Sequence, residues 1–427
     1  MSAHVNTPTP IVWERYIAID LHKHYLMVGG INAQQQVVLT PRKITLDRWL
    51  DWAQANLRST DAVVIEATTN AWHIYDQLVP LVGRVVVAHP PKVKQIAAAR
   101  VKTDKHDVLI LAQLLRADLI PEVWVPPPHV RDLRALISHR QRLLRARTMG
   151  RNRLHSLIHR YNLTPPPGDL FAAKQRHWWV SLDLTLTERL RVDQDLATLD
   201  HLAQHIATVE AELHRLSTTA VWADQVPYLV QLPGIGLITA MILLSAIGDV
   251  TRFGAAQQLV GYAGLGAGVH SSGKTHRTGR ITKEGRRELR WVLVEAAQTA
   301  SRTHPYWQAE FQRLARRIGE KKAIVALARK LLVVIWHVLH GQSVDQRADA
   351  ERVAFKLMVW SWKLTDEQRG GLTSRQFIRA HLIRLGIGND LSHITRGGTK
   401  RAVASVEEVL ALRPELRSSS AGGGTNN

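Results

Sequence analysis

Residues 16–125 alternate short apolar runs with helix-like stretches, and this order constrains the fold of the chain more than any other feature. Strands are predicted at Tyr16–Leu21, Tyr25–Ile31, Gln36–Leu39, Ala62–Glu66 and Arg84–Ala88. Helices are predicted at Asp47–Ala55, Trp72–Leu81, Lys92–Arg100 and Asp104–Ala117. Three strands in succession, followed by alternating helix and strand, predict an α/β domain built on a mixed sheet flanked by helices.

The rest of the chain has helical patterns. Nine arginines and one acid lie between residues 131 and 160, on a partial apolar stripe that predicts a long basic helix. A second amphipathic helix over Val192–Leu216 would pair with it as a coiled-coil-like arm. We therefore expect four parts: an α/β catalytic domain over 12–127, a basic helical linker over 128–222, a mainly helical domain over 223–345, and a helical extension with a disordered tail over 346–427.

Charge and composition limit the function classes. Lys and Arg outnumber Asp and Glu by 56 to 36, a net charge of +20, which makes nucleic acid the first candidate partner. A basic protein of a membrane surface is the alternative. The absence of cysteine excludes disulfides and thiolate metal sites. The longest apolar runs, near Thr239–Ile247 and Leu331–Leu339, have the size of core helices, and no signal peptide pattern is present, so we expect a cytoplasmic protein without a membrane span.

Four carboxylates occupy informative positions. Asp20 ends the first predicted strand, Glu66 ends a buried one, and Asp104 and Asp107 lie three residues apart at the start of a predicted helix, so they share one face. A buried, unpaired carboxylate is costly, and divalent cations remove that cost. Oxygen ligands of this kind suit Mg²⁺ or Mn²⁺, and the layout is that of ribonuclease-H-like nucleases. Taken singly, each acid has an ordinary alternative: Asp104 as a helix N-cap, Asp107 as a surface residue, and Glu66 as the partner of an arginine.

The segments IAIDLHKH, VVIEATTNAW and VVVAHPPKVKQIAAARVKTDKHDVLILAQLL resemble the RuvC-like N-terminal domain of the DEDD-type insertion-sequence transposases. The resemblance implies that Asp20, Glu66, Asp104 and Asp107 form a catalytic metal site. It also aligns Lys102 and Lys105 with the family's K-T-D-K-x-D stretch, where either would contact phosphate. Two solvated lysines are the alternative.

A glycine turn and a basic stretch stand out further along the chain. Gly234 and Gly236 follow Pro233 in a pattern typical of a helix-hairpin-helix turn, although a tight turn between core helices fits as well. From His270 to Arg290 there are seven Lys or Arg and two acids, and six glycines lie between Gly264 and Gly285. We expect a flexible basic loop that contacts phosphate, leading into a helix near Glu284.

Residues Leu229–Arg302 resemble the C-terminal transposase domain of the same family, in which a serine immediately before glycine is the nucleophile. Ser272 occupies that position, next to Ser271. Charge on the phosphate would be stabilised by Lys274, Arg277, Arg280 and Lys283. The resemblance implies a phosphoserine intermediate, double-stranded DNA at the element ends and the target, a structured guide RNA, and a homo-oligomer (dimer or tetramer) in which the two catalytic domains meet across protomers.

The basic helix offers Arg142 and Arg145 as contacts to either RNA or DNA, since charge alone does not separate them. Two other functions remain open on the sequence. A structure-specific nuclease of the junction-resolvase type would need the acids but not Ser272. A non-catalytic nucleic-acid-binding protein would need neither.

Overall fold

The computed structural model describes residues 12–96, 103–272, 275–396 and 398–417, with the side chains of 269–278 excepted. The chain divides into two compact units, Met1–Pro127 and Pro128–Asn427, and each is described by itself. The finer limits at residues 222 and 345 remain predictions.

Unit 1 is a five-stranded mixed sheet with helices on both faces. Its elements are β1 Arg15–Leu21, β2 Tyr25–Asn32, β3 Val37–Thr45, α1 Trp49–Asn56, β4 Asp61–Glu66, α2 Ala71–Leu78, β5 Arg84–Ala88, α3 Pro90–Ile96 and α4 Asp104–Arg116. The strand order is β3-β2-β1-β4-β5; β2 is antiparallel to β1 and β3, and β4 is parallel to β1 and β5. This confirms the expected mixed α/β architecture, with β3 longer than predicted.

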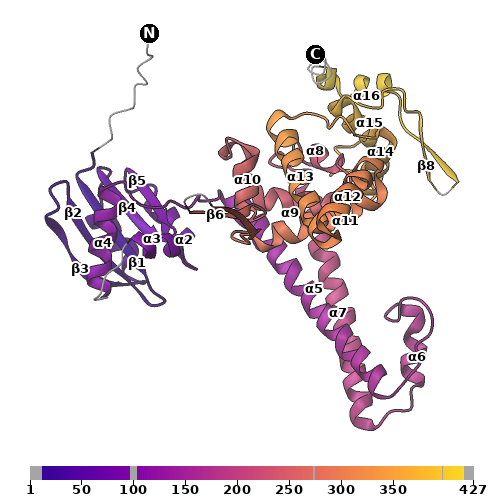
Figure 1. Ribbon diagram of the computed structural model, residues 1–427, viewed down its shortest axis with the longest axis horizontal. Helices are drawn as coiled ribbons and strands as arrows, with labels where there is room; N and C mark the ends of the chain where they lie inside the picture. Colours follow the sequence, from indigo (N-terminus) through magenta and orange to yellow (C-terminus); the bar gives the residue numbers. More distant parts are fainter. Residues whose placement is uncertain (1–11, 97–102, 273–274, 397, 418–427) are drawn as a thin grey trace. The chain divides into compact units, whose positions relative to one another are not determined.

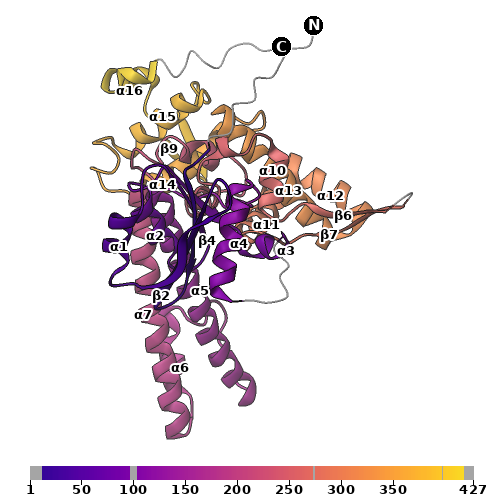
Figure 2. The same cartoon turned by 90° about the vertical axis from the view of Figure 1, so that its left-hand side faces the viewer.

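Alternation along the strands sorts the side chains of unit 1 between two cores. Ile17 and Ile19 of β1 pack on the face covered by α1 and α2, together with Trp49. Tyr16 and Ala18 pack on the opposite face, against α4. Figure 2 shows α1 and α2 on one side of the sheet and α4 on the other. Because successive strand residues point to opposite faces, Asp20 belongs to the α4 face.

Unit 2 is mainly helical. Its helices are α5 Pro128–Arg160, η1 Ala173–Gln175, α6 Arg176–Ser181, α7 Leu186–Leu216, α8 Val226–Val230, α9 Leu237–Ile247, η2 Val250–Arg252, α10 Ala256–Tyr262, α11 Arg287–Thr303, α12 Pro305–Ile318, α13 Glu320–Gly341, α14 Ala350–Ser361, α15 Ser374–Leu385 and α16 Val406–Leu412. Its strands are β6 Ala267–Ser272, β7 Thr275–Ile281, β8 His393–Arg396 and β9 Thr399–Ala402. The predicted helical arm is present: α5 and α7 lie side by side, with α6 at the end of the arm (Figure 1).

The prediction of a flexible loop after residue 264 is wrong in part. β6 and β7 pair antiparallel as a hairpin, and α11 begins at Arg287 rather than near Glu284. The segment contains residues with a high preference for strands, namely Val269, Thr275, Thr278 and Ile281. The prediction gave more weight to the number of glycines and cations than to these residues. Two of the glycines have packing reasons. A Cβ at Gly264 would lie 2.0 Å from the Glu284 carbonyl oxygen, and one at Gly285 would lie 2.0 Å from that of Tyr262, both at positive φ.

The expectation that no segment is long and apolar enough to cross a membrane also needs correction. Among the described residues α13, with 22 residues, is long and apolar enough by length and composition. The prediction considered only uninterrupted apolar runs, whereas α13 carries charges such as Arg329 and Lys330 between its apolar residues. Its stripe from Ala323 to Leu339 is buried in unit 2, and core helices of this kind pass the same test.

Candidate active site

Asp20 and Glu66 end two adjacent parallel strands on the same face of the sheet. Ile19 of β1 is opposite Ile65 of β4. Asp20 and Glu66 are the next residues on these strands, so they are neighbours across the strand pair. Ala18 and Val64, two residues earlier, both pack against the α4 side, which assigns Asp20 and Glu66 to that side by alternation. Both carboxylates are half-buried. The strand register therefore brings together two acids separated by 46 positions in the sequence.

The start of α4 supplies the other two acids. Thr103 is the N-cap, and its side chain accepts a hydrogen bond from the backbone N–H of His106, so Asp104 is not the cap and that alternative is wrong. Asp104 and Asp107 lie in the first turn of α4. The hydroxyl of Tyr25 donates to Oδ2 of Asp104 at 2.9 Å. Because Asp104 does not cap the helix, its carboxylate is directed toward Tyr25 of β2.

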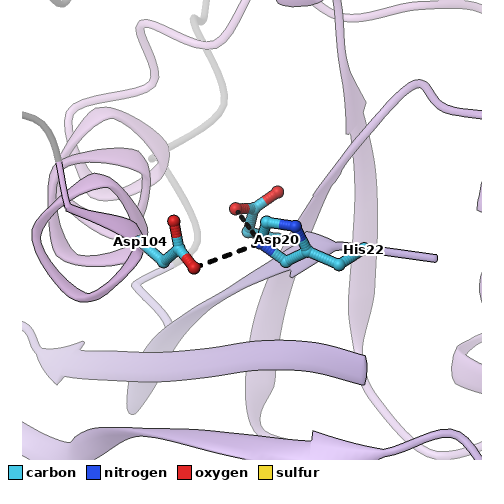
Figure 3. Close-up of side chains that lie close together, drawn as sticks. All are labelled: Asp20, His22 and Asp104. Carbon is cyan, nitrogen blue, oxygen red and sulfur yellow. Dashed lines mark ion pairs between the residues drawn. The ribbon is translucent and has the colours of Figure 1, made fainter. Parts of the chain in front are cut away.

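His22 joins Asp20 and Asp104 into one cluster (Figure 3). Its Nε2 lies 3.0 Å from Oδ2 of Asp20 and 3.6 Å from Oδ2 of Asp104. The imidazole stacks on Tyr25 with ring centroids 4.4 Å apart, which holds its orientation. His22 was not among the residues predicted from the sequence. The available signal was its position two residues after Asp20, because alternation continued one residue beyond β1 would place both side chains on the same side.

Asp107 meets Asp20 and Glu66 at a small cavity of about 140 Å³. Lys94 lines the same cavity, and the rest of its wall is apolar, formed by Val93, Val108, Ile110 and Leu111. The other three predicted acids therefore surround Asp20, with Asp104 on the His22 side and Glu66 and Asp107 on the cavity side. The predicted convergence is present in the geometry, while the catalytic role of these residues remains a proposal.

The electrostatics of the cluster disfavour ionised carboxylates. Burial raises the pKa of Asp20, and the neighbouring Asp104 and Asp107 raise it further, while His22 opposes the shift. Burial also raises the pKa of Glu66, with Asp20 adding to the rise and Lys94 opposing it. A nearby cation would remove both penalties by favouring the charged forms.

A second acid on β4 provides an internal contrast. Asp61, at the other end of the strand, is fully buried, and both its oxygens accept hydrogen bonds from Arg15 at 2.7 and 2.6 Å. No hydrogen bond or ion pair reaches the carboxylate of Glu66 from the described residues, so pairing with an arginine is not observed there. Asp61 is a structural acid, whereas Glu66 has no structural partner.

The donor set of the cluster fits a divalent cation. Ligand atoms of Asp20, His22 and Asp104 lie within 4.8 Å of one another. Nε2 of His22 is buried and makes no well-formed hydrogen bond, which is the state expected of a ligand atom. Carboxylate oxygens suit Mg²⁺ and Mn²⁺, and an imidazole nitrogen adds affinity for a transition metal.

The predicted nucleophile lies on the hairpin of unit 2. Ser272 ends β6, and its backbone pairs with Thr275 of β7. The backbone of Arg277 pairs with His270, and Lys274 lies outside the described residues, as does Lys102 of unit 1. The side chains of Ser272 and Arg277 also lie outside the described residues, so their roles stay predictions. Figure 2 shows the hairpin extending away from α11.

Two family models match the chain in the order expected from the sequence. Residues 17–163 match the DEDD transposase model of the IS110 group, and residues 226–312 match the transposase IS116/IS110/IS902 family. The chain belongs to the DEDD-type insertion-sequence transposases. It is a DNA-acting enzyme of the transposase and recombinase class, and the family implies dependence on a divalent metal.

Relatives of this transposase cover most of its length. The transposase for insertion sequence element IS1111A of Coxiella burnetii is 27% identical over 342 residues, covering 77% of this chain and 90% of the relative. A pilin gene-inverting protein of Moraxella bovis is 29% identical, covering 78% and 98%. The transposase for insertion sequence element IS1328 of Yersinia enterocolitica is 25% identical, covering 56% and 72%.

Two groups of arginines on α5 of this transposase differ in their partners. Arg140, Arg153 and Arg160 pair with acids of α7, which are Glu210, Asp195 and Glu188. Arg142 and Arg145 are exposed and have no charged or hydrogen-bonded partner among the described residues. Lys105, Arg280 and Lys283 are exposed as well. These residues remain available to nucleic acid, and their contacts remain predictions.

The predicted glycine turn connects α8 and α9. Gly234 has a φ of +78°, and a Cβ there would lie 2.1 Å from the carbonyl oxygen of Ala296, so packing against α11 requires glycine. Gly236 faces open space and is the N-cap of α9. Both glycines line a cavity of about 660 Å³ together with Arg347 and Arg352. Gly234 thus has a structural explanation, whereas Gly236 leaves room for a ligand.

Proposed function

We propose that this transposase moves an insertion sequence by metal-assisted strand cleavage and exchange through a phosphoserine intermediate. The observation that carries the proposal is the convergence of Asp20, Glu66, Asp104 and Asp107 on one face of the unit 1 sheet, where no arginine among the described residues neutralises them. The strand order, three antiparallel strands followed by two parallel ones, supports a ribonuclease-H-like, RuvC-like fold for this unit.

The four acids, with His22, would hold Mg²⁺, or Mn²⁺ as the alternative. Such ions, when bound, supply positive charge to a phosphodiester and favour deprotonation of an attacking oxygen. Within the chain, Tyr25 orients Asp104 through its hydroxyl, and Lys94 contributes a positive charge beside Glu66. The apolar wall of the cavity excludes water from one side of the site.

Ser272 is the proposed nucleophile. Its hydroxyl oxygen attacks phosphorus, the bond from phosphorus to a deoxyribose oxygen breaks, and that oxygen leaves with a proton. A free DNA end then attacks the phosphoserine and regenerates the serine, so the bond energy is retained and no ATP is needed. Lys274, Arg277, Arg280 and Lys283 would stabilise charge on the phosphate.

The partners are proposals of the same kind. A DNA substrate follows from the family, and we propose that it is double-stranded at the element ends and the target. We also propose that a structured guide RNA is held by the exposed face of α5, including Arg142 and Arg145. The turn at Gly234–Gly236 is proposed as a helix-hairpin-helix contact to phosphate, supported by the adjoining arginine-lined cavity. We further propose a homo-oligomer (dimer or tetramer) that acts in the cytoplasm, where the DNA is.

A covalent adduct tests the proposal. The protein is co-expressed with its flanking non-coding DNA, given labelled element-end DNA and Mg²⁺, and run on a denaturing gel. We expect a labelled protein band that is lost in Ser272→Ala and in Asp20→Ala, and retained in the matched control Ser271→Ala. Cutting without an adduct, preserved in Ser272→Ala and absent in Asp20→Ala, would indicate a hydrolytic nuclease instead. Binding without cutting in the wild type would indicate a non-catalytic protein.

A further inference from the structure

A groove of about 550 Å³ lies between α5 and α11 of unit 2, and its lining includes no residue assigned a catalytic role. Its walls are Gln141, Leu144, Arg145, Thr148 and Met149 of α5 and Arg287, Glu288 and Trp291 of α11. The α5 residues recur at helical spacing, which places them on one face of that helix. The groove is therefore a continuous surface shared by two regular elements, not a gap between loops.

Trp291 does not belong to the core of unit 2. The buried residues of α11 form a stripe from Leu289 to Ser301, and Trp291 lies off that stripe with 48% of its surface exposed. Across the groove, Met149 is 61% exposed. Single exposed apolar residues are ordinary, but two that face one groove form a patch available to a ligand.

The ring of Trp291 is uncovered. No aromatic ring and no cation stacks on it among the described residues. Trp362 is 51% exposed, yet the guanidinium of Arg401 lies 5.0 Å from its ring centroid and covers that face. The chain thus covers one exposed tryptophan with its own arginine and leaves the other open.

The charge around the groove is positive. Arg145 and Arg287 line it and have no partner among the described residues, and Arg142 lies one turn along α5. Glu288 is the single acid in the lining, in the first turn of α11, where a negative charge stabilises the helix N-terminus. An anionic ligand with a flat apolar part would therefore be complementary to this surface.

We propose that this groove binds unpaired nucleotides of a single strand, with a base stacked on Trp291 and the adjoining phosphates paired with Arg145 and Arg287. The inference rests on the proposed function, in which the exposed face of α5 holds a nucleic acid. It adds that the part held in the groove is an unpaired single strand. A base inside a duplex presents no free face to an indole, so the site selects unpaired nucleotides over double-stranded DNA. The sulfur of Met149 provides a polarisable contact for the base.

The test measures affinity of the full-length protein, without metal, for labelled single strands of RNA, of DNA of the same sequence, and for the blunt DNA duplex. We expect Trp291→Ala to weaken single-strand binding roughly ten-fold, Trp291→Phe to retain most of it, and duplex binding to stay unchanged. Trp362→Ala is the matched control and should bind as the wild type does. A loss with either single strand supports the proposal, and the strand that loses more identifies the source of the nucleotides.

Unchanged single-strand affinity in Trp291→Ala would overturn the inference, as would an equal loss with the duplex. A change in oligomeric state, measured by light scattering, with unchanged affinity per protomer would overturn it in favour of a second copy of the chain in the groove. The assay involves no cleavage, so its failure is independent of the adduct experiment, which tests the proposed function alone.

Discussion

The carboxylate cluster of unit 1 and the arginine-rich helix of unit 2 use charge in different ways. Asp20, Glu66 and their neighbours lie together, where burial and mutual repulsion raise the pKa of the first two. On α5 most of the described ion pairs are made with α7, and Arg142 and Arg145 are left without partners. In both regions the fold leaves residues of functional interest without an oppositely charged lysine or arginine partner at ion-pair distance, as at Glu66 and Arg142, and paired residues of the same kind, such as Asp61 and Arg140, serve as controls.

The largest expected difference is between substitutions of the two acids of β4, Glu66 and Asp61, in their effects on cleavage and stability. Glu66→Gln should reduce strand cleavage on the order of 10³-fold, because loss of a metal ligand removes several kcal/mol of transition-state stabilisation. It should leave the melting temperature of unit 1 unchanged or higher. Asp61→Asn should instead destabilise the fold by about 3–5 kcal/mol, since it breaks a buried pair with Arg15. Cleavage assays and thermal unfolding of both variants provide the measurement; the reverse pattern would make Glu66 structural.

His22 sharpens the comparison within the cluster. His22→Ala should weaken Mg²⁺ or Mn²⁺ binding roughly 10- to 100-fold, whether the imidazole is a ligand or orients Asp20 and Asp104. His24→Ala is the matched control, since His24 is exposed at the end of the same segment. Calorimetric titration with each metal measures the effect, and equal affinities in the two variants would exclude His22 from the site.

The two groups of arginines on α5 should separate binding from stability. Arg142→Ala with Arg145→Ala should weaken nucleic-acid binding and reduce the slope of log affinity against log salt by about 1.8, if each contacts one phosphate. Arg140→Ala should instead lower the stability of the arm, because it removes the hydrogen bonds to Glu210. Binding measured across a salt series distinguishes the groups; a slope that is unchanged in the double variant would remove both residues from the interface.

The last expected effect concerns pH and arises from a histidine of unit 2. His381 packs against Trp360 and Phe377, and burial lowers its pKa to about 3. Because the unfolded chain takes up this proton first, the contribution of neutral His381 is complete above about pH 6.5 and is lost as the pH falls toward 3. The loss is at most about 1.4 kcal/mol per pH unit.

Denaturant unfolding at several pH values between those limits checks this expectation. His381→Phe, which keeps an aromatic ring in place, should show a shallower loss of stability in acid than the wild type. His393→Phe, at an exposed position on β8, should behave as the wild type does. Parallel pH profiles for His381→Phe and the wild type would contradict the lowered pKa.

The sequence alone determined the architecture of unit 1 and the location of its acids. Continuous apolar runs such as Ala62–Glu66 identify buried strands, and alternation fixes which side chains share a face. The prediction of β5 was correct at both ends, and the long basic helix was found, because such local patterns depend on neighbours in the chain. The β6–β7 hairpin was missed because glycine and charge counts outweighed its short alternating pattern.

The tertiary structure decided which polar residues are satisfied. Sequence does not show that Asp61 is neutralised by Arg15 while Glu66 is not, or that His22 lies between Asp20 and Asp104. It does not show which arginines of α5 are paired by α7, or that Trp291 stays uncovered. These outcomes depend on contacts between residues far apart in the chain, whose distances are set by strand register and helix packing rather than by local preference.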